Sequence, residues 1–159
     1  MAFLVYAKAN VFSLGHICQG VYTFLVPRSP KPFDLPRLFA ALSDRTRLRL
    51  LNLMGDREVC VCYFVEILGQ SQPKISRHLA YLRNAGIVKA RREGKWMHYR
   101  MERPADYGAA SVLDATFATL KTDREMQSDL SKLSKACCAP ARFTTLQGAP
   151  VPARVDQVA

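Results

Sequence analysis

The sequence predicts a mainly α-helical fold with one small β-hairpin. Apolar residues recur at helical spacing from Asp34 onward, which indicates several short amphipathic helices. After Gly86 the pattern changes to two strand-like segments, which is typical of a β-hairpin. The 159 residues suffice for one domain with a sizeable core, and 49% apolar and 23% charged residues are an ordinary globular balance.

Four short helices are expected ahead of the hairpin. They are a first helix through Leu35, Leu38, Phe39 and Leu42, a second from Arg45 to Met54, a third from about Glu58 to Leu68, and a fourth that Ser71 caps and Gly86 ends. Cap and stop residues at the helix ends favour these bounds. Because only a tight turn at Gly69-Gln70 separates the last two helices, they predict a helix-turn-helix unit.

The hairpin that follows this unit is interpreted as a wing. Its two strands are expected at 87–92 and 96–101, joined at Glu93-Gly94-Lys95. Residues 34–103 are therefore predicted to form a winged helix-turn-helix DNA-binding domain.

The two ends of the chain carry weaker patterns. Residues 104–135 are expected to form one long helix, and its apolar stripe outside the winged core favours a role in dimerisation. Residues 136–159 are interpreted as a loose tail that carries the pair Cys137-Cys138. Residues 1–33 are an N-terminal extension of unclear role, and its Cys18 is interpreted as an incidental buried thiol.

The charge distribution indicates a polyanion partner. The formal net charge is +10, and much of the excess lies between Ser71 and Arg103. That span holds nine basic residues against two acids, Glu93 and Glu102: Lys74, Arg77, Arg83, Lys89, Arg91, Arg92, Lys95, Arg100 and Arg103. A solvated basic face is the alternative interpretation, but the helix-turn-helix pattern favours duplex DNA.

The expected DNA contacts lie on the fourth helix and on the wing. With Ile75, Leu79 and Leu82 turned inward, the cations of the fourth helix project from its opposite side. The predicted contact residues are Ser71, Gln72, Lys74, Ser76, Arg77 and His78 on the helix and Arg91, Arg92 and Lys95 on the wing. For His78 the alternative is a polar residue at the helix flank.

Five cysteines suggest a thiol-based site rather than disulfides. They are Cys18, Cys60, Cys62, Cys137 and Cys138. This odd, clustered set fits a reducing cytoplasm better than a secreted disulfide framework. No run approaches the roughly 18 apolar residues of a membrane span, so no membrane partner is expected. Thiolates at Cys60 and Cys62 are soft ligands for thiophilic ions, and two small buried thiols are the alternative.

Three ordered motifs closely resemble the ArsR family of arsenic-responsive winged-helix repressors. They are Glu58-Val59-Cys60-Val61-Cys62, the run from Gln70 to Leu79, and the run from Gly94 to Arg100, within a similarity that spans roughly Leu35 to Lys135. The resemblance implies a homodimer on an inverted-repeat operator. It also implies repression of an arsenic-resistance operon until arsenite or antimonite, As(III) or Sb(III), binds as inducer. No obligatory cofactor is expected.

The chain departs from the family pattern at the thiol motif. Val65 stands where the best-known arsenic members have a third thiol, and Tyr63 stands where an acid often follows the CxC. Cys137 and Cys138 then become the natural source of a third sulfur. Relatives with such C-terminal pairs also bind inducers elsewhere, and methylated trivalent arsenic, which needs only two sulfurs, is an alternative inducer.

The CxC spacing suggests a switching mechanism. On a regular helix Cys60 and Cys62 would sit about 200° apart, so they could not both reach one ion. In an extended segment residues i and i+2 share a face. Binding of one ion through both sulfurs is therefore expected to unwind the start of the third helix and so weaken DNA binding.

Other classes fit the sequence less well. A thiol-redox repressor would use a reversible disulfide at either cysteine pair. A zinc- or cadmium-responsive repressor of the same fold is a second alternative, although structural zinc usually takes four ligands. A thiol-dependent reductase is the alternative from another class. The chain has neither a CxxC before a helix nor a phosphate-cradling loop, so no enzyme is predicted.

Overall fold

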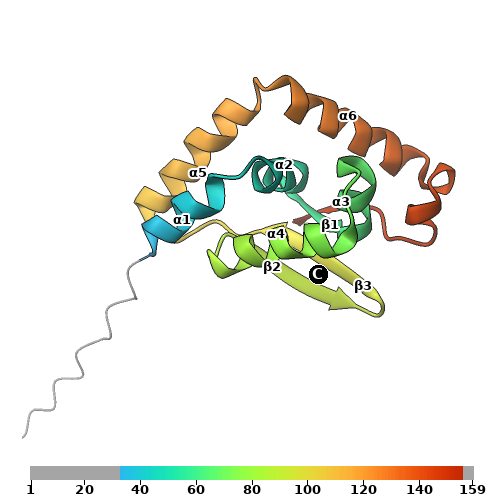
Figure 1. The fold of residues 1–159 in the computed structure, drawn as a ribbon, viewed down its shortest axis with the longest axis horizontal. Coiled ribbons are helices and arrows are strands. Elements are labelled where there is room, and N and C mark those ends of the chain that lie inside the picture. The colour runs from blue at the N-terminus through green and yellow to red at the C-terminus, as the bar shows by residue number, and fades with distance from the viewer. Residues whose placement is uncertain (1–32, 156–159) are drawn as a thin grey trace, which may run out of the picture. The chain divides into compact units, whose positions relative to one another are not determined.

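The computed structural model describes residues 33–155, which form six α-helices and a small antiparallel sheet (Figure 1). The elements are α1 (Leu35–Leu42), α2 (Arg45–Met54), β1 (Arg57–Cys60), α3 (Val61–Leu68), α4 (Gln72–Asn84), β2 (Val88–Glu93), β3 (Trp96–Met101), α5 (Tyr107–Leu120), α6 (Arg124–Cys138), two 3-10 turns at Pro140–Arg142 and Thr144–Leu146, and β4 (Ala153–Arg154). The predicted mainly α class with a hairpin wing is confirmed. The N-terminal extension, with Cys18, lies outside the described residues except for Phe33.

Asp side chains begin four of the helices. Asp34, Asp44, Asp106 and Asp123 precede α1, α2, α5 and α6, and each accepts a hydrogen bond from a backbone N–H in the first turn. These N–H groups have no partner within their own helix, so a capping carboxylate satisfies them. The bounds of α1 and α2 agree with those predicted from the sequence.

The helix-turn-helix unit consists of α3 and α4. Gly69 ends α3 in the left-handed conformation, with φ of 60°, which glycine adopts without a Cβ penalty. Ile75, Leu79 and Leu82 of α4 are fully buried, as their spacing predicts. Helix α4 therefore packs its apolar stripe on α2, α3 and β2 and leaves its opposite face open.

The wing is the hairpin of β2 and β3. Its turn is one residue shorter than predicted, because Glu93 pairs with Trp96 and only Gly94-Lys95 lie between them. Gly94 has a φ of 56°, as a tight two-residue turn requires. In the sheet order β2-β3-β1-β4, the wing continues directly into β1, so it is not an isolated ribbon.

The start of the predicted third helix is a strand. Residues 57–60 form β1, where Val59 faces Tyr99 and Cys60 faces His98 of β3, and α3 begins only at Val61. The apolar run Val59–Val61 is compatible with either a strand or a helix, and pairing with β3 decides between them.

The expected long C-terminal helix is two helices. Helix α5 ends at Leu120, and Asp123 caps the start of α6 through the backbone N–H groups of Glu125 and Met126. The charged residues after Leu120 interrupt the apolar stripe, and the chain turns there. Helix α6 then packs along α2 and α3 (Figure 1), which buries Leu133 and Ala136 within the same chain.

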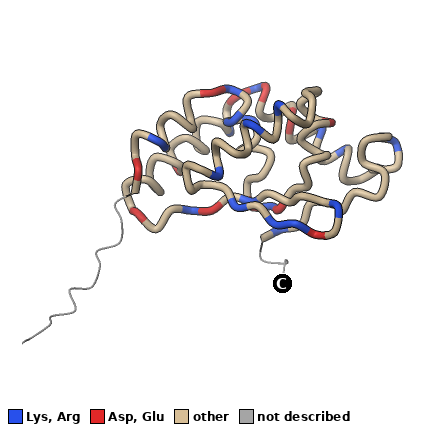
Figure 2. The backbone as a smooth tube through the Cα atoms, turned by 60° about the horizontal axis from the view of Figure 1, so that its bottom comes forward, with Lys and Arg blue, Asp and Glu red and all other residues tan. Residues whose placement is uncertain are grey.

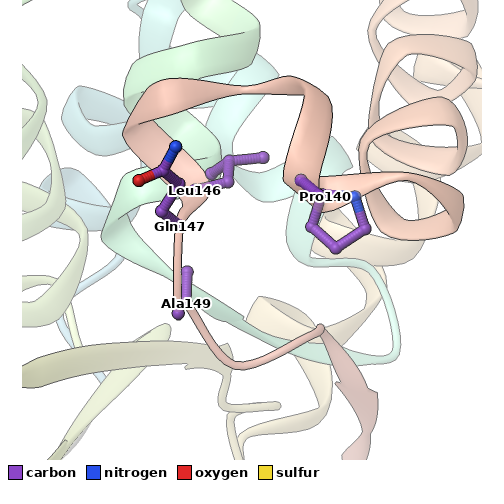
Figure 3. Close-up of a pocket in the computed structure, with 6 residues that line it drawn as sticks. Pro140, Leu146, Gln147 and Ala149 are labelled. Atoms are coloured by element: carbon purple, nitrogen blue, oxygen red, sulfur yellow. The ribbon is translucent and has the colours of Figure 1, made fainter.

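The expectation of a loose tail is corrected for residues 136–155. Strand β4 pairs with β1, and the Val155 N–H donates to the Asp56 carbonyl over 3.0 Å. Between α6 and β4 the chain folds around a pocket lined by Pro140, Leu146, Gln147 and Ala149 (Figure 3). Leu146 is buried, so this segment contributes to the core. Within residues 33–155, no helix has the length and apolar character needed to cross a membrane.

Candidate functional site

The open face of α4 carries most of the predicted DNA contacts. Ser71, Gln72, Lys74 and Arg77 are exposed, and Ser76 is half-buried beside them. Ser71 stands at the N-cap position, so this set occupies the N-terminal half of the helix. The part of such a helix that usually meets base edges is therefore free and basic.

His78 lies elsewhere. Its Nδ1 is 3.4 Å from Oδ1 of Asp44, the residue that caps α2. Burial lowers the pKa of His78, outweighing the charge of Asp44, which raises it. A neutral imidazole against Asp44 connects α4 to α2, so this predicted contact residue faces inward to the fold rather than toward open solvent.

The three predicted cations of the wing have different partners. Figure 2 shows a concentration of Lys and Arg on the hairpin. Arg92 donates to the Gly94 carbonyl, and the Lys95 ammonium lies 4.8 Å from the ring centre of Trp96. Arg91 instead donates to the carboxylate of Glu58 on β1. Arg92 and Lys95 are thus the cations near the turn of the hairpin, whereas Arg91 is held by Glu58 of the neighbouring strand β1.

Cys60 and Cys62 are brought together at the junction of β1 and α3. Cys60 has extended backbone angles, φ −68° and ψ 143°, whereas Cys62 lies in the first turn of α3. The Cys62 thiol donates to the Cys60 sulfur over 2.7 Å, and both cysteines are free. The expected 200° separation is therefore wrong, because Cys60 is not helical. Both sulfurs can approach one ion without unwinding of the helix, which removes the reason for the predicted strain.

The two thiols differ in their acidity. The hydrogen bond from Cys62 lowers the pKa of Cys60 from 9.0 to about 7, and backbone N–H groups of Cys62, Met97 and Val61 lower it further against the effect of burial. The pKa of Cys62 is raised, first by its bond to Cys60 and then by burial. Near neutral pH the pair is therefore one thiolate and one thiol, and a thiolate is the form that binds soft ions.

Cys137 and Cys138 end α6 and are not joined to this pair. Cys137 is half-buried and Cys138 exposed. Across residues 33–155, no three His, Cys, Asp or Glu side chains are grouped closely enough to hold a metal ion. Cys60 and Cys62 are therefore the two predicted ligands that the fold brings together.

Tyr63 is the residue that follows Cys62 in α3. Its side chain is fully buried, and its hydroxyl has no hydrogen-bond partner among residues 33–155. The pKa of Tyr63 is raised to about 12, mainly by burial and then by the charges of Cys137, Cys62 and Cys60. In the sequence, Tyr63 stands out only as a departure from the family pattern.

Two further buried polar residues were missed. Glu58 on β1 and His98 on β3 are almost completely buried next to Cys60. The available signal was an acid in a strand-like apolar run, which requires a partner when buried.

Comparison with known proteins places these features in one family. The family model described as "Bacterial regulatory protein, arsR family" matches residues 44–90. The "Arsenical resistance operon repressor" of Escherichia coli is 39% identical over 109 residues, which cover 67% of this chain and 92% of that protein. The "Arsenic resistance transcriptional regulator ArsR1" of Pseudomonas putida is 51% identical over 93 residues, which cover 55% of this chain and 73% of the relative.

Among solved structures, HlyU from Vibrio cholerae is similar at 26% identity with a TM-score of 0.47, covering 54% of this chain and 89% of that chain. The matched relatives regulate transcription and are not enzymes. With 92% of the Escherichia coli repressor covered at 39% identity, the chain belongs to the ArsR family of bacterial regulatory proteins.

Proposed function

We propose that this chain is a metalloid-responsive repressor that leaves its operator when trivalent arsenic or antimony binds Cys60 and Cys62. One observation carries the proposal: the two sulfurs lie 2.7 Å apart, and the pKa of Cys60 is lowered to about 7. This pair stands at the start of α3, the helix on which α4 packs. An ion bound there would act on the support of the DNA-reading helix.

The donor set favours soft ions. Thiolate sulfur selects polarisable ions over Mg²⁺ or Ca²⁺, and structural zinc usually takes four ligands. The relatives named for arsenical and arsenic resistance support an arsenic species as inducer, and antimonite is proposed as its chemical analogue. A third sulfur would come from Cys137 or Cys138, of the same subunit or of the partner. Methylated trivalent arsenic would need only Cys60 and Cys62.

The DNA partner is proposed to be an inverted-repeat operator bound by a homodimer. Each subunit would place α4 in the major groove, where Lys74 and Arg77 reach phosphates or base edges. The exposed cations at the wing tip, Arg92 and Lys95, would contact the adjacent backbone. Free thiols of this kind fit a reducing compartment, which favours the cytoplasm.

A gel-shift titration tests the proposal. The operator is first selected from random duplex DNA by the protein, and release is then measured with arsenite, antimonite, methylarsenite, zinc and peroxide. Wild type is expected to release DNA with the arsenic and antimony species. Cys60→Ser and Cys62→Ser are expected to bind DNA as wild type does and to stay bound at all arsenite concentrations. Normal release from Cys60→Ser would overturn the thiol site.

Arg77→Ala is the matched control on the DNA side. It should weaken operator binding about tenfold and reduce the dependence on salt, while arsenite binding stays unchanged. The closeness of the two sulfurs also favours a second candidate, a thiol-redox repressor. Release by peroxide and not by arsenite would identify that candidate.

A further inference from the structure

A row of polar side chains, buried except for Arg91, connects the thiol strand to the wing. Glu58 lies two residues before Cys60 on β1, and alternate residues of a strand share a face. Cys60 is paired with His98 on β3, and His98 is paired with Arg91 on β2. Paired residues also share a face, so all four side chains lie on one side of the sheet.

The carboxylate of Glu58 is held by Arg91. Arg91 donates to Oε1 of Glu58 from Nε over 2.9 Å and from Nη2 over 2.6 Å. Glu58 is 4% exposed, whereas the side chain of Arg91 is 46% exposed. A buried carboxylate without a cation is strongly unfavourable, so Arg91 must follow any displacement of Glu58.

His98 fills the space between this ion pair and the thiol. Its Nδ1 lies 3.7 Å from Oε1 of Glu58, and its Nε2 lies 3.8 Å from Glu93 at the end of β2. His98 is also the residue of β3 that pairs with Cys60 of β1. One residue of β3 therefore adjoins both the thiol residue and the carboxylate, and a shift of one strand is transmitted to the other.

We infer that Glu58 is a positioning residue that passes occupancy of the thiol site to the DNA-binding wing through its bond to Arg91. The inference rests on the proposed function. An ion that binds Cys60 displaces the end of β1, Glu58 moves with its strand, and Arg91 carries β2 along. The wing-tip cations Arg92 and Lys95 then leave the positions in which they meet the DNA backbone.

The test compares the weakening of DNA binding by arsenite in matched variants. For each protein, the operator dissociation constant is measured with and without saturating arsenite, and the ratio is the coupling. Glu58→Gln keeps the size of the side chain and removes its charge. Arg91→Gln breaks the same bond from its exposed end. Both variants should bind arsenite as wild type does, whereas their coupling should fall about tenfold, within the usual range for linked sites.

Arg92→Gln is the matched control. It neighbours Arg91 on β2, and within the described part of the chain its side chain bonds only to the Gly94 carbonyl. It should weaken operator binding and leave the coupling at the wild-type value. Arg91→Gln also removes the 2.9 Å ion pair between Arg91 and Glu93. The double variant Glu58→Gln/Arg91→Gln should therefore lose no more coupling than Arg91→Gln, which already breaks the bond to Glu58. Circular dichroism melting of each variant verifies the fold, and the double variant, which leaves no buried carboxylate without a cation, provides the readout if a single variant does not fold.

The outcomes separate this inference from the proposed function. Wild type that stays on DNA with arsenite would refute the proposed function, and the relay with it. If arsenite releases the wild-type protein from DNA, but Glu58→Gln and Arg91→Gln keep the wild-type coupling, only the transmission through Glu58 and Arg91 is refuted. Loss of coupling in Arg92→Gln as well would show that any wing cation has this effect, and would equally overturn a specific role for Glu58.

Discussion

The two cysteine pairs of this chain differ in what the backbone does with them. Cys60 and Cys62 are separated by one residue, yet a strand-to-helix junction brings their sulfurs within 2.7 Å. Cys137 and Cys138 are adjacent in sequence, yet they lie on one continuous helix, where neighbouring residues diverge by about 100°. Closeness in sequence is therefore a poor guide to closeness of ligands, and the local change of backbone conformation is decisive.

The environments of the two pairs differ as well. The pKa of Cys60 is lowered by a donated hydrogen bond, whereas the pKa of Cys137 is raised, mainly by burial. Ionisation is therefore favoured at Cys60 of the first pair and disfavoured at Cys137 of the second. The comparison supports Cys60 and Cys62 as the proposed primary site, with Cys137 and Cys138 as the proposed source of a third sulfur.

The largest expected effect is on the free energy of unfolding. It concerns the ion pair that holds α6, the helix that ends in Cys137 and Cys138. Arg49 donates to Asp129 of α6 from Nε over 2.6 Å and from Nη2 over 2.9 Å, and Asp129 is fully buried. In Asp129→Ala the mostly buried guanidinium of Arg49 loses this carboxylate partner. The free energy of unfolding measured with urea should therefore fall by about 3 kcal/mol. The Cys60 pair does not lie on α6, so its thiolate titration should be unchanged.

Asp114→Ala is the control for this anchor. Asp114 pairs with Arg103 at the surface, where an ion pair is screened by water, so its loss should be much smaller. Equal losses for Asp114→Ala and Asp129→Ala would contradict the view that the Arg49–Asp129 pair fastens α6 to α2.

Some features of this fold can be predicted from the sequence, whereas others depend on contacts between distant segments. The inward stripe of Ile75, Leu79 and Leu82 and the hairpin wing follow from spacing alone, because each is set by a local period. The extended conformation of Cys60 does not follow from spacing. Strand β1 forms only through pairing with β3 and β4, which are distant in sequence. Strand β4 itself is two residues long, too short for any pattern.

The site was predictable in its residue types but less so in its partners. The exposed cations of α4 lie where helical geometry places them, as Lys74 and Arg77 show. Arg91 and His78 were expected to face DNA, but they contact Glu58 and Asp44 within the fold. A sequence pattern identifies a cation on a face. It does not reveal a carboxylate that a distant strand or helix cap brings beside it.

The next effect in size concerns the acidity of Cys60. Cys62→Ala removes the hydrogen bond that lowers the pKa most, so the pKa should rise from about 7 toward its usual value of 9.0. Thiolate absorbance at 240 nm measures this titration, with Cys60→Ser as the blank that identifies the signal. At pH 8 Cys60 should be mostly thiolate in wild type and mostly protonated in Cys62→Ala. An unchanged titration would show that backbone N–H groups alone set its acidity.

The smallest effect concerns the second pair and distinguishes the two forms of arsenic. In Cys137→Ser/Cys138→Ser the primary thiolate remains, but inorganic arsenite loses its third sulfur. The arsenite concentration for half-release should rise about tenfold, equivalent to about 1.4 kcal/mol of binding free energy. Methylarsenite, which needs two sulfurs, should release DNA as it does from wild type.

The environment of Tyr63 helps to interpret the arsenite and methylarsenite titrations. The charge of Cys137 raises the pKa of Tyr63, as those of Cys60 and Cys62 do, although within residues 33–155 the two pairs are not assembled into one site. If neither inducer responds to the loss of Cys137 and Cys138, the site is complete with Cys60 and Cys62 alone. If both inducers respond equally, these residues support the fold around Tyr63 and are not ligands. Only a response confined to arsenite makes them the third donor.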